Sequence, residues 1–170
     1  MLFAEKPVSY YWDYFKLPFY ILLAWSVIGA ILAFINFTTY QSIFTPLIGV
    51  IVQVLLFGFA GFTLYEEAKD ANLGLATWSG ALMGVFMGFI GAIISLVLMF
   101  TLPAMTDVIV QQAAAKGVTL TASQIDMMKY LSFTSLISAP IVSGLFGAVC
   151  GLAGGAVAKL LGNKPKGKKK

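Results

Sequence analysis

Four long apolar runs dominate the sequence, and most polar residues fall in the segments between them. The runs cover residues 18–37, 45–65, 80–102 and 131–162. Each has about the 20 residues, or more, that a helix needs to cross a hydrocarbon core of roughly 30 Å. The pattern predicts an all-α, polytopic membrane protein. We expect one integral membrane domain over residues 1–170, with four transmembrane helices in a bundle.

The segment before the first run, residues 1–17, interleaves aromatic residues with charged ones. Tyr and Trp favour the depth of the lipid headgroups, and amphipathic helices lie in that layer. The segment therefore predicts a short interfacial helix, which Ser9 caps after Pro7. The alternative is a terminal segment whose aromatic residues only anchor the first span.

Residues 104–130 form the one sizeable segment outside the runs. A short amphipathic helix is expected over residues 107–115. Gly117, which follows it, is typical of a helix end. The sequence of residues 121–124, Thr-Ala-Ser-Gln, matches the capping box and predicts a new helix that starts directly after the Thr. We expect that helix to lead into the fourth span, with a kink near Pro140.

Small residues recur at every fourth position in the last two runs. Positions four apart lie on one face of a helix, and a row of small residues lets two helix backbones approach closely in a bilayer. We therefore expect the third and fourth spans to cross through these rows. The alternative is that one row faces a second copy of the chain in a homo-oligomer. The predicted helix-packing residues are Gly80, Gly84, Gly88, Ser143, Gly147, Gly151 and Gly155.

Composition agrees with a membrane protein. The chain is 59% hydrophobic and only 11% charged, and its mean hydropathy is +0.90, so few charges remain for the surface of a soluble domain. All 11 basic residues are Lys. Without Arg there are no bidentate forks for phosphate, and without His the commonest metal ligand is missing. Cys150 is the only cysteine, which excludes a disulfide framework within the chain.

The lysines predict the orientation. If both termini are cytoplasmic, nine lysines lie inside, and only Lys116 and Lys129 lie outside, as the positive-inside rule requires. We expect a multi-pass protein of the cell membrane with both termini in the cytoplasm. Residues 163–170 form a basic tail that we expect to contact anionic headgroups rather than nucleic acid; the alternative is a solvated tail that only sets the orientation. The tail lysines are Lys164, Lys166, Lys168, Lys169 and Lys170.

Polar chemistry inside the spans is limited. No Asp, Glu or Lys lies at the centre of a run, which argues against an ion-driven pump. The mid-span Gln53 is expected to hydrogen-bond to Ser95 or to a hydroxyl group within residues 132–143, and the alternative is a contact with a substrate. We interpret the acidic residues within 66–70 as a solvated loop rather than a metal site.

Signatures of catalysis are missing from the sequence. It contains no His, no nucleophile elbow and no phosphate-cradling loop, so we expect no enzyme, no cofactor and no metal.

There is a weak internal echo: residues 58–61 (GFAG) resemble residues 151–154 (GLAG), and residues 28–31 and 90–93 are both IGAI. Such an echo would fit two parallel hairpins, a repeat type that some transporters use.

Three features carry a resemblance: the link over residues 66–79, the Gly80-x3-Gly84-x3-Gly88 helix, and the helical insert before the last span. Over its C-terminal two-thirds the layout resembles that of small uncharacterised four-helix membrane proteins of prokaryotes. It also resembles, distantly, the Yip-type membrane proteins of vesicle transport. The all-Lys composition is similar to that of small archaeal membrane proteins. The resemblance implies a polytopic scaffold or accessory role.

These features predict a non-enzymatic integral membrane protein that acts by helix packing, as a scaffold, an accessory subunit or a membrane-organising module. The expected partners are the lipid bilayer, anionic headgroups, and further copies of the chain or a larger membrane complex. The alternative is a small transporter or channel that functions as an oligomer, which the internal echo and Gln53 favour.

Overall fold

The computed structural model describes residues 6–35, 46–68, 71–101 and 117–161, together with residues 107, 110, 111, 113 and 114. Within these ranges there are four long helices and no strand. Each helix is long and apolar enough to cross a membrane. The predicted all-α fold with four spanning helices is confirmed, and the chain is an integral membrane protein. The helices are α1 (Val8–Ile35), α3 (Pro46–Glu67), α4 (Leu73–Thr101) and α6 (Ala122–Leu160).

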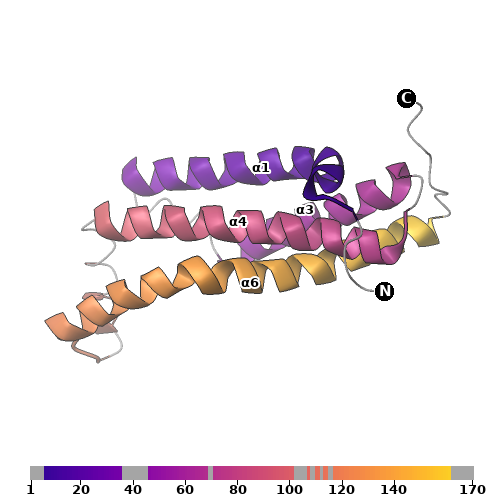
Figure 1. Ribbon diagram of the computed structural model, residues 1–170. Coiled ribbons are helices and arrows are strands. Elements are labelled where there is room, and N and C mark those ends of the chain that lie inside the picture. Colours follow the sequence, from indigo (N-terminus) through magenta and orange to yellow (C-terminus); the bar gives the residue numbers. More distant parts are fainter. Residues whose placement is uncertain are drawn as a thin grey trace.

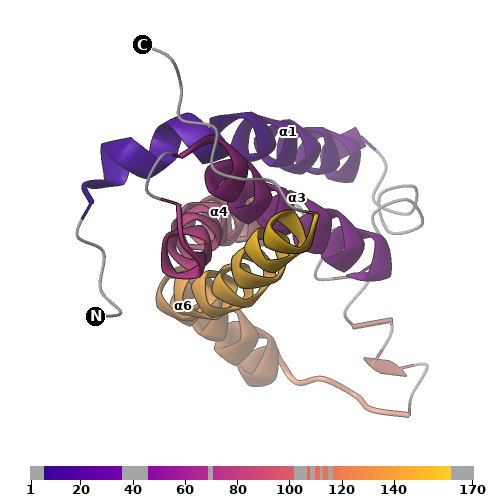
Figure 2. The same ribbon diagram turned by 90° about the vertical axis from the view of Figure 1, so that its right-hand side faces the viewer.

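The four helices pack as one bundle. In Figure 1, α4 lies between α1 and α6, and the end-on view of Figure 2 shows α3 beside them. Helix α6 packs against α4 and α3, whereas α1 packs against α3 and α4. The start of α1 and the end of α6 lie at the same end of the bundle (Figure 1), together with the end of α3 and the start of α4. We call this the terminal end.

Helix α1 unites two predicted elements. It begins at Val8, so Ser9 lies within its first turn and not at the predicted cap. It continues through Pro18, so the short helix predicted before residue 18 is the first part of α1 rather than a separate element. The reason is packing: Tyr11 and Phe15 are completely buried, and the ring centroid of Phe15 lies 6.2 Å from that of Phe86 in α4. These aromatic contacts hold the helix together across the one backbone hydrogen bond that Pro18 removes. Figure 2 shows the first turns changing direction relative to the rest of α1.

Helix α4 begins at Leu73 rather than at residue 80, so residues 73–79 of the predicted link belong to the helix. The side-chain oxygen Oδ1 of Asn72 accepts a hydrogen bond of 2.9 Å from the backbone N–H of Leu75. This is the geometry of an N-cap, which satisfies one of the unpaired N–H groups at a helix start. The Asn72 signal is present in the sequence, and the polar residues around it concealed the helix.

Helix α6 starts where the capping box predicts. The backbone N–H of Thr121 donates to Oε1 of Gln124 at 2.8 Å, and the N–H of Gln124 donates to Oγ1 of Thr121 at 3.4 Å. The helix has 39 residues, or about 58 Å at 1.5 Å per residue. Its apolar part is Phe133–Leu160, so its first turns extend beyond the membrane core. Pro140 lies inside the helix, and Figure 1 shows α6 changing direction along its length.

The predicted helix end before α6 is also confirmed. Gly117 has a φ of +75°, a conformation that favours glycine. Its N–H donates to the carbonyl of Ala114 at 2.9 Å, and the N–H of Val118 donates to the carbonyl of Ala113 at 2.9 Å. These two bonds form the Schellman pattern of a helix C-terminus. The described residues that precede it, from Asp107 to Ala114, are helical.

The shared terminal end leads to a test of orientation. The lysine bias predicts that this end is cytoplasmic. In a Cys150→Ala background, a cysteine replacing the exposed Val118 should react with a membrane-impermeant thiol reagent in intact cells. A cysteine replacing Lys168 should react only after the cells are permeabilised. The reverse pattern would show that the predicted orientation is wrong.

Candidate functional site

The most extensive helix contact in the bundle is that of α4 with α6. A Cβ atom placed on Gly80 would meet the carbonyl oxygen of Gly147 and lie 2.8 Å from the Cα of Gly151. At Gly84 it would meet the carbonyl oxygen of Ser143 and lie 3.1 Å from the Cα of Gly144. No real Cβ atom has room at such distances from backbone, so the two backbones are in direct contact here.

The same contact continues at both ends of the row. A Cβ on Gly88 would lie 2.6 Å from the Cα of Pro140, and one on Gly151 would lie 2.6 Å from the carbonyl oxygen of Ala76. A Cβ on Gly155 would lie 2.6 Å from the Cβ of Ala76. The structure therefore brings all seven of the predicted packing residues to one helix contact, within a single chain.

A second glycine contact joins α6 to α3. A Cβ on Gly61 would lie 2.7 Å from the Cα of Gly151, and one on Gly154 would lie 3.0 Å from the Cα of Gly58. The sequence analysis missed this contact, because Gly58 and Gly61 are not part of a row with a spacing of four. The sequence feature that could have indicated this contact is the similarity between residues 58–61 and residues 151–154. These two similar segments face each other in the bundle.

A buried serine links α4 to α3. Ser79 of α4 has no exposed surface, and its hydroxyl donates to the carbonyl oxygen of Ala60 in α3 at 3.3 Å. The bond adds a polar link between these two helices. Interhelical hydrogen bonds in membranes contribute about 0.6–2 kcal/mol each, so Ser79 supports the packing of α3 on α4.

Gln53 does not make the predicted bond. Its side chain is exposed, as is that of Ser95, and the structure contains no hydrogen bond between them. Gln53 lies one turn before the buried Phe57 on α3. One turn earlier, a Cβ on Gly49 would have no atom within 4 Å. Gln53 therefore lies on the outer face of α3, and its amide faces outward.

The acidic residues near the end of α3 do not form a metal site in the part of the chain that the structure describes. Glu66 and Glu67 are half-buried, and Asp70 lies outside the described residues. No group of three or more His, Cys, Asp or Glu among the described residues is placed to hold a metal ion. Glu66 and Glu67 are the last two residues of α3, so the predicted loop over residues 66–70 does not include them.

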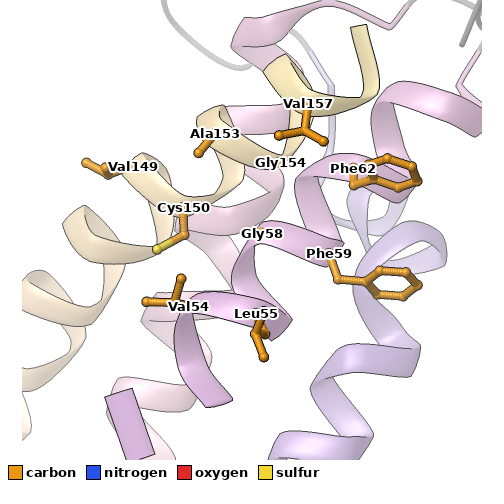
Figure 3. Close-up of a pocket in the computed structure, with 10 residues that line it drawn as sticks. All are labelled: Val54, Leu55, Gly58, Phe59, Phe62, Val149, Cys150, Ala153, Gly154 and Val157. Carbon is orange, nitrogen blue, oxygen red and sulfur yellow. The ribbon is translucent and has the colours of Figure 1, made fainter. Parts of the chain in front are cut away.

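A groove of about 500 Å³ runs along the outer side of the contact between α3 and α6. We call it the α3–α6 groove. Figure 3 shows its lining, which comes from both helices and is apolar apart from the thiol of Cys150. Gly58 and Gly154 also line it, and because neither has a side chain the groove reaches the two backbones. The other lining side chains include Val54, Phe59, Phe62, Val149, Ala153 and Val157.

Comparison with protein-family models, with curated proteins and with solved structures finds no match to this chain. Its own geometry therefore carries the functional argument.

The predicted headgroup contacts, the five lysines of residues 163–170, lie outside the described residues. They follow directly on α6, which ends at Leu160. Near an anionic surface each lysine contributes about 1 kcal/mol.

Proposed function

We propose that the protein is a non-enzymatic membrane scaffold or accessory subunit, which acts by presenting a rigid helix bundle to partners in the bilayer. The observation that carries the proposal is the double glycine contact of α6. Gly151 meets Gly80 of α4 on one side and Gly61 of α3 on the other. Three backbones in contact leave no space between them for a solute, and they hold the helices in one arrangement.

The distribution of polar groups favours this role over the alternative of a transporter or channel. Substrate sites of transporters lie near the membrane midplane, and intramembrane ionisable groups mark most ion pathways. Here the buried hydroxyl of Ser79 is engaged by the backbone of α3. The amide of Gln53 faces outward. Neither group belongs to a polar route through the bundle.

A flux measurement tests the proposal. Proteoliposomes that contain the purified chain should show the same uptake of inorganic ions and small polar solutes as protein-free vesicles. Purification of the tagged chain in a mild detergent should retain a membrane partner in a fixed ratio. Specific, saturable uptake that Gln53→Leu abolishes would contradict the scaffold role and support the oligomeric transporter.

A further inference from the structure

We propose that the α3–α6 groove binds one acyl chain of an anionic phospholipid from the leaflet at the terminal end. This lipid site goes beyond the scaffold role and does not depend on it. The argument rests on the lining of the groove, on its depth in the membrane and on the charge that follows α6.

The lining suits a hydrocarbon chain. Its side chains are aliphatic or aromatic apart from Cys150, and cysteine in such surroundings behaves as a small hydrophobic residue. A polar ligand would find almost no hydrogen-bond partner there and would lose its own hydration. The volume of about 500 Å³ lies within the range of binding sites for small ligands. The groove is open on the outer side of the bundle, where lipid is the surrounding solvent.

The depth of the groove matches one leaflet. On α6 its lining runs from Val149 to Val157, and the helix ends at Leu160. At 1.5 Å per residue these positions lie about 5–17 Å from the end of the helix. Each leaflet supplies about half of a hydrocarbon core of roughly 30 Å. The groove therefore lies at the depth of the acyl chains whose headgroups surround the terminal end.

The lysines that follow α6 in the sequence favour a lipid with an anionic headgroup. In the sequence, residues 1–17, 66–72 and 159–170 flank the helix ends that meet at the terminal end. They contain nine of the 11 lysines and five of the seven acidic residues, so they account for the whole net charge of +4. Five of these lysines follow α6 within ten residues of Leu160. Because an extended chain spans up to about 3.6 Å per residue, the first of them, Lys164, reaches at most about 14 Å beyond Leu160. The sequence therefore places positive charge within reach of the headgroups of that leaflet.

The site can be tested on the unmodified chain. The protein is reconstituted in bilayers of equal parts phosphatidylglycerol and phosphatidylcholine, with a trace of phosphatidylglycerol that carries a photoreactive diazirine in its acyl chain. After irradiation we expect adducts within residues 54–62 and 149–157. Adducts spread evenly over other exposed positions, such as Ile137 and Leu145, would show annular lipid only and would overturn the proposal.

A matched pair of variants tests the groove itself. Ala153→Phe fills the groove, whereas Ala156→Phe adds the same ring to α6 at a position that does not line it. After extraction into mild detergent, native mass spectrometry should find one phosphatidylglycerol on the unmodified chain and on Ala156→Phe. Retention by Ala153→Phe should fall at least about tenfold, with an unchanged thermal transition. Equal retention by both variants would overturn the site; if Ala153→Phe does not fold, the photoadducts decide.

The role of charge has its own readout. Replacement of the five tail lysines by Gln should leave the retained lipid in place but remove its preference for phosphatidylglycerol over phosphatidylcholine. High salt should weaken the same preference in the unmodified chain. A preference unaffected by either change would contradict the headgroup assignment. A lipid-free dimer that Ala153→Phe converts to a monomer would make the groove an interface between copies, and would overturn the lipid proposal.

Discussion

Gly84→Ala is expected to destabilise the bundle strongly, whereas Gly91→Ala on the same helix leaves it unchanged or slightly more stable. The added methyl group at position 84 would meet the backbone of Ser143, and backbone cannot move aside as a side chain can. Overpacking of a tight interior costs about 1–3 kcal/mol. At Gly91 no atom lies within 4 Å of the same methyl group. Thermal unfolding of the purified chain in detergent measures both effects.

The contact between α3 and α6 provides a second matched pair for this prediction. A Cβ on Gly154 would meet the carbonyl oxygen of Gly58, whereas a Cβ on Gly58 would lie 3.6 Å from the carbonyl oxygen of Cys150, an ordinary contact distance. Gly154→Ala should therefore lower the unfolding temperature, and Gly58→Ala should not. If Gly84→Ala and Gly91→Ala unfold at the same temperature, the backbone contact does not determine the stability of the bundle.

A disulfide should form between cysteines that replace Val85 and Gly144. A Cβ on Gly144 would lie 2.7 Å from Cγ2 of Val85, and the sulfur of a cysteine at position 85 can take the place of that methyl group. The resulting bond needs little change in the backbone, which is the condition for an unstrained disulfide. It should stabilise the chain by about 2–4 kcal/mol. The measurement is non-reducing electrophoresis together with thermal unfolding, in a Cys150→Ala background.

The same experiment decides between the two arrangements that the sequence leaves open. Chains with two different tags are co-expressed, and the disulfide should form within single chains only. A control pair joins a cysteine at position 85 with one replacing the exposed Val149, and it should stay reduced. Crosslinks found only between differently tagged chains would refute the contact within one chain and would assign the glycine rows to an oligomer interface.

The ends of the helices show how far local patterns reach. The start of α6 was predictable because the capping box is made by residues within one turn of each other. The start of α4 was not predicted, although Asn72 caps it, because the preceding polar residues suggested a longer loop. The continuity of α1 through Pro18 was not predicted, and Tyr11 and Phe15, which precede Pro18, are buried in the bundle. Local signals do not contain such contacts.

The sequence by itself determined the four spans, the small-residue rows of α4 and α6, and the absence of ionisable groups from the span centres. Each of these is a property of one helix and of its length in a bilayer. Only the tertiary structure decided which faces α1 and α3 present to the other helices. The crossing of α3 over α6 places Gly58 against Gly154, opens a groove beside them and leaves Gln53 outside. That crossing results from many weak contacts between residues far apart in the chain, and no single segment encodes it.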